Sequence, residues 1–128
     1  MNRAVLLVGH GSKIEGSNDA MNRVVGELTK RDASTFFQQA FLELQSPSIP
    51  DGINLCIQQG AAEVIVVPYF VQTGKHVVQD IPRIVQEAQA AHPKTVVSLA
   101  NYLSFDSRIV SMIEDRVKET RRPKLVNE

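Results

Sequence analysis

Apolar runs and helix-spaced apolar positions alternate along the chain. The run from 4 to 8 ends at Gly9, and four consecutive β-branched residues follow Glu63. Short apolar runs that end at turn signals are typical of strands buried on both faces. The segment near 35–42 fits both a helix and a strand period, and we interpret it as a strand. The pattern thus predicts strands at 4–8, 35–42, 63–70 and 95–100.

Between these runs, apolar residues recur at spacings of three and four, which places them on one face of a helix. Pro50 suits a first helical position and Gly60 a helix end. Pro82 is tolerated if it lies in the first turn or two of its helix. The last helix carries the apolar set Ile109, Met112, Ile113 and Val117. The pattern predicts helices near 17–31, 50–60, 77–91 and 105–120.

This alternation predicts an α/β fold. Right-handed crossovers between consecutive strands give a parallel sheet with helices on both faces. We therefore expect a doubly wound domain over residues 1–120, with a four-stranded parallel sheet flanked by helices, and a polar tail at 121–128. In such sheets, ligands bind outside the carboxyl ends of the strands. The residues that follow each strand are therefore the candidates for function.

Two histidines and one carboxylate follow three of the predicted strands: His10, Glu43 and His76. We expect them to meet at one rim of the sheet. Two imidazoles and a carboxylate suit a first-row divalent metal, and three protein ligands leave positions open for water or substrate. Each residue alone has a more ordinary interpretation, as a loop, capping or solvent-facing residue. The prediction of a metal or catalytic site rests on the three together.

Lysines accompany both rim histidines. Lys13 and Lys75 each lie within three residues of one of them, so they place positive charge beside the predicted site. Exposed lysines are common, and an incidental placement is the alternative. If the ligand is a polyanion, the two lysines could bind or steer it.

Other candidate residues point to weaker sites. His92 lies at a predicted helix end and is interpreted as a surface residue, and Cys56 on an inward helix face as a small core hydrophobe. Ser12 follows His10 closely, but the chain lacks the G-x-S-x-G elbow of serine hydrolases. Ile14 breaks the G-x-G-x-x-G pattern of dinucleotide-binding loops. Neither a serine nucleophile nor a nicotinamide cofactor is therefore supported.

The amino-acid composition excludes several classes of function. A length of 128 residues suits one domain, and 43% hydrophobic with 22% charged residues is typical of a soluble globular protein. Fourteen basic and fourteen acidic residues give zero net charge, which argues against a nucleic-acid partner. A single cysteine excludes an intrachain disulfide framework and fits a reducing, cytoplasmic compartment. No apolar run approaches the roughly 20 residues needed to span a membrane.

Taken in chain order, these motifs resemble the short-form sirohydrochlorin chelatases, the cobaltochelatase and ferrochelatase group of class II chelatases. The resemblance covers residues 4 to about 117. The matching pieces are Leu7-Val8-Gly9-His10-Gly11-Ser12, Ala40-Phe41-Leu42-Glu43, Val66-Val67-Pro68-Tyr69-Phe70, Gly74-Lys75-His76-Val77, Asp80-Ile81-Pro82 and Tyr102-Leu103-Ser104-Phe105-Asp106.

This resemblance implies a chelatase-like fold and insertion of cobalt, iron or nickel into sirohydrochlorin, in cobalamin or sirohaem biosynthesis. By position, His10 and His76 match the family's metal-binding and catalytic histidines, and Glu43 its active-site carboxylate. The metal is then a substrate, and no tightly bound cofactor is expected. Ser12, Lys13 and Lys75 are candidates for contacts to the carboxylates of the tetrapyrrole. Longer relatives carry a second copy of the domain, which suggests that this short chain forms a homodimer.

Two alternatives use the same residues differently. A metal or tetrapyrrole carrier of the same fold would bind without turnover. A flavodoxin-like interaction domain would carry its rim histidines incidentally. The sequence favours the chelatase, and binding and turnover measurements separate the three.

Overall fold

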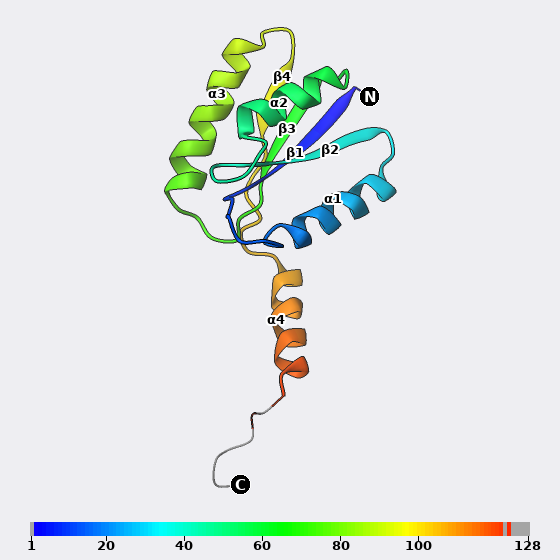
Figure 1. Ribbon diagram of the computed structural model, residues 1–128, viewed down its shortest axis with the longest axis vertical. Helices are drawn as coiled ribbons and strands as arrows, with labels where there is room; N and C mark the ends of the chain where they lie inside the picture. The colour runs from blue at the N-terminus through cyan, green and yellow to red at the C-terminus, as the bar shows by residue number, and fades with distance from the viewer. Residues whose placement is uncertain (1, 122, 124–128) are drawn as a thin grey trace.

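A four-stranded parallel sheet in the order β2-β1-β3-β4 forms the centre of the molecule in the computed structural model, which describes residues 2–121 and 123 (Figure 1). The predicted α/β class with a four-stranded parallel sheet is confirmed. The elements in chain order are β1 (Arg3–Gly9), α1 (Asp19–Arg31), β2 (Thr35–Phe41), α2 (Ile49–Gln58), β3 (Glu63–Pro68), η1 (His76–Asp80), α3 (Ile81–Ala91), β4 (Val96–Leu99) and α4 (Ser107–Glu119).

Strands β2, β1 and β3 begin and end nearly level with one another. Arg3 of β1 lies opposite Thr35 of β2 and Glu63 of β3, and Gly9 lies opposite Phe41. Because the strands are parallel, the loops that follow β1, β2 and β3 leave the sheet at the same edge. This register positions the candidate site.

Two core clusters follow from the alternation of side chains along β1. Leu6 faces the larger cluster, which α2 and α3 cover, and Leu7 faces the smaller one, which α1 covers. Ile53 of α2 and Ile81 of α3 are fully buried against the larger cluster. Burying such a side chain stabilises the fold by roughly 1.5–3 kcal/mol. The sheet therefore has helices on both faces, as expected.

The third predicted helix begins with a wider turn than expected. Residues His76–Asp80 form a π-helical turn, η1, which continues directly into α3. Pro82 explains why a regular α-helix is disfavoured here: it has no N–H for the carbonyl of Val78, and its ring would crowd that carbonyl. In the π turn, the N–H of Ile81 instead donates to the carbonyl of His76.

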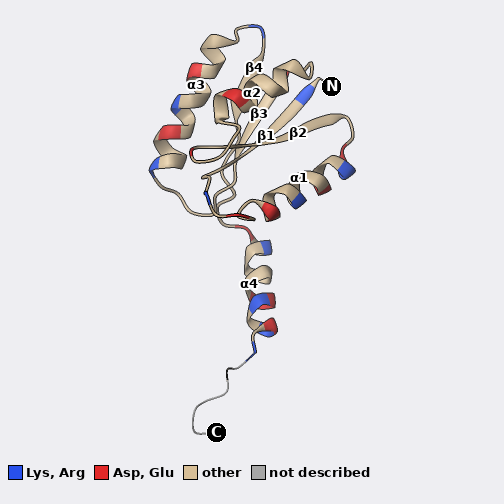
Figure 2. Cartoon of the chain, viewed as in Figure 1, with Lys and Arg blue, Asp and Glu red and all other residues tan. Residues whose placement is uncertain are grey.

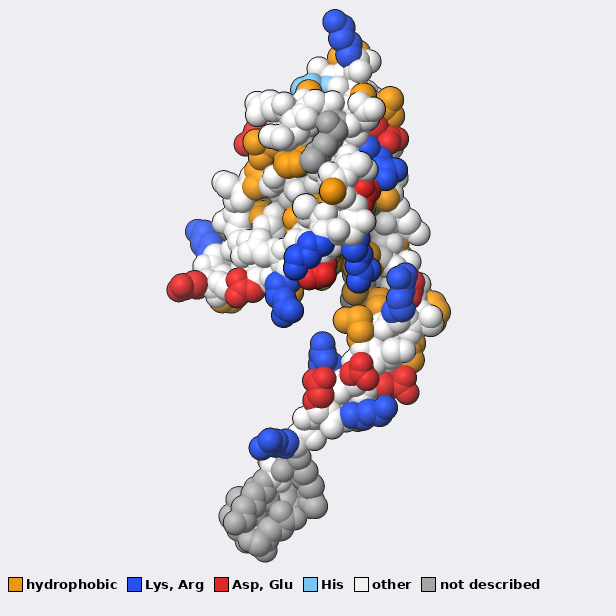
Figure 3. All heavy atoms as spheres, turned by 90° about the vertical axis from the view of Figure 1, so that its right-hand side faces the viewer, with side chains coloured by type: hydrophobic (Ala, Val, Ile, Leu, Met, Phe, Trp, Pro, Cys, Tyr) orange, Lys and Arg blue, Asp and Glu red, His pale blue; other side chains and the backbone are white. Residues whose placement is uncertain are grey.

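Helix α4 does not cover the sheet. It stands away from the rest of the molecule (Figure 1), and none of its residues is buried. Its predicted apolar stripe is present but open, with Met112 54%, Ile113 59% and Val117 68% exposed. The space-filling view shows apolar side chains on α4 (Figure 3), and charged residues cluster toward its second half (Figure 2). The stripe is therefore largely open, although Ile109 and Met112 line a cavity that they share with Val24 and Leu28 of α1.

The expected tail at 121–128 lies largely outside the described residues. None of the helices in the described part of the chain combines the length and apolarity that crossing a membrane requires.

Candidate functional site

The loops that follow β1 and β2 continue to pair after the strands end. The N–H of Leu42 donates to the carbonyl of Gly9 at 3.0 Å, and the N–H of Glu43 donates to that of His10 at 3.1 Å. This backbone ladder brings the side chains of His10 and Glu43 together, with His10 Nε2 2.7 Å from Glu43 Oε1. The sheet register thus builds the first half of the site.

Gly11 permits this close approach. Its φ is 102°, in the left-handed region that side chains disfavour, and a Cβ built on it would lie 1.7 Å from the carbonyl oxygen of Glu43. One residue later, the N–H of Ser12 donates to Gln45 Oε1 at 2.9 Å. The two loops are therefore tied together on both sides of the His10–Glu43 pair.

His76 joins the pair from the third loop. Its ring centroid lies 4.9 Å from that of His10, and the two planes meet at 87°, in an edge-to-face arrangement. The structure thus places the three predicted residues, from the ends of three strands, beside one another. Their roles as ligands and catalysts remain predictions.

Asp80 is a fourth member of this cluster, and the sequence reasoning did not identify it as one. His76 Nδ1 lies 2.8 Å from Asp80 Oδ2, and the Asp80 side chain is only 22% exposed. The signal that could have found it is the spacing of four residues, which brings side chains together on a helix. The sequence pattern predicts a helix from about 77, which places His76 at its start and not within it.

The two imidazoles therefore each have one nitrogen committed to a carboxylate. Within the described residues, no hydrogen bond engages His10 Nδ1 or His76 Nε2. The same part of the chain holds no group of three or more histidine, cysteine or carboxylate side chains placed so that they could hold a metal ion together. The cluster thus offers nitrogen and oxygen ligands suited to divalent first-row metals, without a preformed set that encloses an ion.

A hollow of about 310 Å³ adjoins His10. It combines aromatic and apolar side chains with polar groups at its edge, a mixture typical of sites for small organic molecules. Its lining includes His10, Ser12, Asn18, Met21, Phe41, Gln45, Tyr69 and Phe70.

The three residues predicted to contact the substrate, Ser12, Lys13 and Lys75, lie at the same edge of the sheet. Lys13 and Lys75 are exposed, and neither forms an ion pair with another described residue. The hydroxyl of Ser12 accepts a hydrogen bond from the N–H of Ile14 at 3.1 Å. Contact of these three residues with a substrate remains a prediction.

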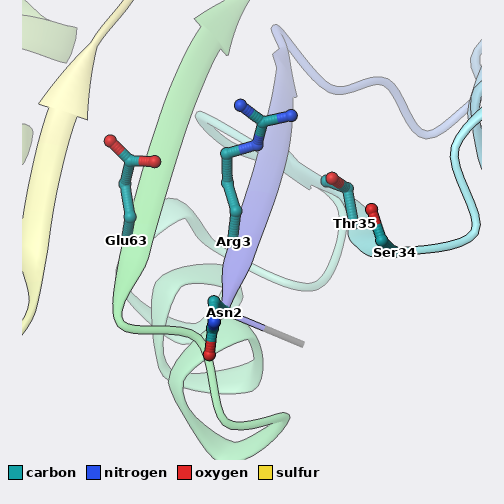
Figure 4. A pocket seen from close by; sticks show the side chains of 5 residues that line it. All are labelled: Asn2, Arg3, Ser34, Thr35 and Glu63. Carbon is teal, nitrogen blue, oxygen red and sulfur yellow. The ribbon is translucent and has the colours of Figure 1, made fainter.

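A larger pocket of about 620 Å³ lies at the opposite, amino end of the strands (Figure 4). Arg3, which lines it, lies 3.6 Å from the Asp32 carboxylate. Hydrogen bonds from the hydroxyl side chains of Ser34 and Thr35 lower the pKa of Asp32. We interpret this region as a structural polar cluster at the amino end of the strands and not as a ligand site, because ligands of such sheets bind at the carboxyl end.

Cys56 agrees with its sequence interpretation, whereas His92 lies at a helix end as predicted but is half-buried. Cys56 is completely buried in the larger core cluster, and burial raises the pKa of its thiol to about 11. His92 follows the last residue of α3, at the other end of that helix from His76, and its N–H donates to the carbonyl of Ala88 at 3.0 Å. Neither belongs to the cluster at the rim.

The CbiX family model matches residues 4–120 of this chain. The chain is 36% identical over 119 residues to a sirohydrochlorin ferrochelatase of Priestia megaterium, an alignment that covers 91% of this chain and 44% of that relative. It is 30% identical over 129 residues to a sirohydrochlorin cobaltochelatase of Methanothermobacter thermautotrophicus, covering 89% of this chain and 90% of that protein. The chain spans about half the length of several curated relatives it matches, the Priestia megaterium protein among them.

Solved structures show the same arrangement of elements. The sirohydrochlorin chelatase SirB of Bacillus subtilis subspecies spizizenii, in complex with cobalt, superimposes with a TM-score of 0.85 at 29% identity, covering 93% of this chain and 51% of that one. SirB from Bacillus subtilis with Fe³⁺ gives a TM-score of 0.83 at 28% identity, and the match covers 96% of this chain and 49% of SirB.

Proposed function

The chain belongs to the CbiX family, and on that basis we propose that it is a metal chelatase that inserts a divalent metal ion into sirohydrochlorin. The observation that carries this proposal is the meeting of His10, Glu43 and His76 at the carboxyl edge of the sheet. His10 and Glu43 lie in direct contact, in two loops that continue the pairing of β1 with β2, and His76 is the first residue of η1.

Metal insertion requires two kinds of group. The ion must exchange its water for the four nitrogens of the macrocycle, and the macrocycle must release two pyrrole N–H protons as the metal–nitrogen bonds form. An imidazole nitrogen can bind the ion or accept a proton. His10 Nδ1 and His76 Nε2 are free for either task among the described residues, and the Glu43 carboxylate balances the charge of the ion.

The incomplete ligand set supports transfer rather than storage. A closed four-ligand site holds a structural metal firmly, whereas catalytic sites keep positions open. In this cluster, Glu43 is 54% exposed and His10 48% exposed, so both are accessible to a ligand that arrives from solvent. An ion held by few protein ligands can leave for the macrocycle.

The substrate is a polycarboxylate. We propose that the hollow beside His10 receives part of the macrocycle and that Lys13, Lys75 and the loop at Ser12 contact its carboxylates. The exposure of both lysines, without ion pairs in the described part of the chain, supports this assignment.

Cobalt and iron are the proposed physiological metals, with nickel as the third candidate. Relatives carry the names ferrochelatase and cobaltochelatase, and imidazole–carboxylate sites bind several such ions. The product would then enter cobalamin or sirohaem biosynthesis. A cytoplasmic location remains a prediction.

The direct test is insertion by the purified chain. Sirohydrochlorin is mixed with Co²⁺, Fe²⁺ or Ni²⁺, and the change in its visible spectrum is followed with and without protein. The proposal predicts faster insertion with at least one metal and many turnovers per chain. Absence of acceleration with all three metals would refute it, and stoichiometric binding without turnover would indicate a carrier.

We propose further that residues 1–120 form one domain and that the active form is a homodimer. The open apolar stripe of α4 supports this. So does a mainly apolar cavity of about 460 Å³ between α1 and α4, lined by Val24, Leu28, Leu103, Asp106, Arg108, Ile109 and Met112. Relatives of about twice the length could supply the second half from one chain. Sedimentation of a monomer at working concentration would contradict the dimer.

A further inference from the structure

We propose that Asp80 is a positioning residue for His76: its carboxylate accepts the Nδ1–H of the imidazole and so keeps Nε2 unprotonated for the reaction. The use of Nε2 rests on the proposed function, whereas the hydrogen bond and the tautomer do not. The distance of 2.8 Å between His76 Nδ1 and Asp80 Oδ2 carries the inference.

The π turn gives this pair its geometry. His76 and Asp80 are the first and last residues of η1, whose wider turn closes with the Ile81 N–H to His76 carbonyl bond. Side chains four apart come nearly into line along the axis of such a turn. Pro82 follows two residues later and disfavours a regular α-helix here. Insertions of this type occur often at functional sites, and this one places a carboxylate beside a candidate catalytic imidazole.

Burial distinguishes this pair from an ordinary surface ion pair. Asp80 is 22% exposed, and the described residues provide it with no lysine or arginine partner. One turn further along, Arg83 and Glu87 show the same spacing of four residues but are 60% and 66% exposed, as expected for a solvated pair. Asp80 is therefore held against His76 in a more sheltered position.

The two carboxylates of the cluster also differ in how far they are exposed to solvent. Glu43 is 54% exposed and Asp80 only 22% exposed. A carboxylate open to solvent can exchange its partner when an ion or a macrocycle arrives, whereas a sheltered one holds its partner in place. We therefore assign Glu43 to contact with the ion and Asp80 to orientation of the imidazole.

A neutral imidazole carries one proton, and the hydrogen bond made by one ring nitrogen decides which nitrogen carries it. A carboxylate that accepts from Nδ1–H leaves the lone pair on Nε2. Metal-binding histidines commonly have such a partner, and its removal typically lowers metal affinity or activity about 10–100-fold. In His10 the arrangement is reversed, since Nε2 and not Nδ1 lies beside the Glu43 carboxylate. The two rings would then present different nitrogens.

The tautomer is measured first, on the metal-free full chain, by two-bond ¹H–¹⁵N NMR of the histidine rings at a pH well above the ordinary imidazole pKa of about 6.5. Wild-type His76 should show protonated Nδ1. Asp80→Ala should shift His76 toward the Nε2–H form, and Asp80→Asn, whose amide oxygen can still accept, should retain more of the original state. Glu87→Gln is the matched control and should change nothing.

Cobalt binding is measured second, by titration of the same variants with Co²⁺ followed by its visible absorption. Asp80→Ala should bind about 10–100-fold more weakly than wild type, with Asp80→Asn between them and Glu87→Gln unchanged. A His76 tautomer that is the same in wild type and both Asp80 variants would overturn the proposal, as would unaltered cobalt affinity. If Asp80→Ala does not fold, Asp80→Asn decides by the same two readouts.

These outcomes are separate from those of the proposed function. An Asp80-dependent tautomer in a chain that inserts no metal would refute the chelatase and leave the positioning role intact. If the chain inserts metal but the His76 tautomer does not depend on Asp80, the proposed function stands and the positioning role of Asp80 is refuted.

Discussion

His10 Nε2 and Glu43 Oε1 lie 2.7 Å apart although 33 positions separate the two residues in the chain. The contact is a product of the sheet, because the backbone pairing of β1 with β2 continues through the N–H of Glu43 to the carbonyl of His10. Any change that disturbs the two loops should therefore affect the site before it affects the core.

Substitution of Glu43 by glutamine tests the role of its charge. The variant keeps the size of the side chain and removes the negative charge, so we expect metal insertion to slow by about 10–100-fold with an unchanged far-ultraviolet circular dichroism spectrum. Glu63→Gln, at the amino end of β3, is the control and should retain full activity. Equal insertion rates for Glu43→Gln and wild type would exclude a role for the carboxylate.

Gly11→Ala should distort the site and lower stability. The new Cβ would fall 1.7 Å from the Glu43 carbonyl oxygen at a φ of 102°, and a left-handed conformation alone costs an alanine about 1–2 kcal/mol. Gly26→Ala is a matched control, since Gly26 lies in α1 and an added Cβ there would meet no atom within 4 Å. This control should raise stability by about 0.5–1 kcal/mol. Denaturant unfolding measures both; equal stabilities would contradict the close approach at Gly11.

The thiol of Cys56 should react slowly in the folded chain. Burial raises its pKa from 9.0 to about 11, and a thiol pKa higher by about two lowers the thiolate fraction near pH 8 by about 100-fold, which matters because only the thiolate reacts. Iodoacetamide should therefore modify Cys56 at least about 100-fold faster in the unfolded chain than in the folded chain. Equal rates in the folded and unfolded chains would contradict the burial of this side chain.

The same shift has a consequence for stability. The folded state favours the neutral thiol, so the contribution of Cys56 is complete below pH 9.0 and declines as the pH rises through about 11. Comparison of Cys56→Ala with wild type across this range isolates the effect. We expect the difference in unfolding free energy between the two proteins to shrink with rising pH, and a constant difference would count against the raised pKa.

Charged residues on the α4 stripe should dissociate the proposed dimer. Met112→Glu with Ile113→Glu places two carboxylates on a face that is apolar and open in the single chain, and we expect the dimer dissociation constant to rise at least about tenfold, since each tenfold change needs only about 1.4 kcal/mol. Ser111→Glu, also on α4, is the control. Analytical ultracentrifugation distinguishes the outcomes, and a dimer unaffected by the double substitution would show that α4 is not its interface.

Much of this architecture could be predicted from the sequence because it depends on local patterns. The β-branched run after Glu63 and the apolar run before Gly9 identify two inner strands. The rule that ligands bind where strands end then selects His10, Glu43 and His76. The structure places these three together, as that rule predicted.

Other features depend on contacts that a pattern does not contain. Asp80 acquires its partner only because the helix begins one residue earlier than expected, in a π turn that Pro82 favours. The stripe on α4 predicts that an apolar face needs a cover, but amphipathicity carries no information about which surface provides it. Both features required the three-dimensional arrangement.

The most direct test of the proposed function is the initial rate of Co²⁺ insertion into sirohydrochlorin by four proteins: wild type, His10→Ala, His76→Ala and His92→Ala. His92 follows the C-terminal end of α3, whereas His76 begins the η1 turn that leads into that helix, so His92→Ala controls for the loss of an imidazole. We predict that wild type and His92→Ala accelerate insertion equally and that His10→Ala and His76→Ala do not accelerate it, while all four have native circular dichroism spectra. Full activity in both rim variants would contradict the assignment of the site.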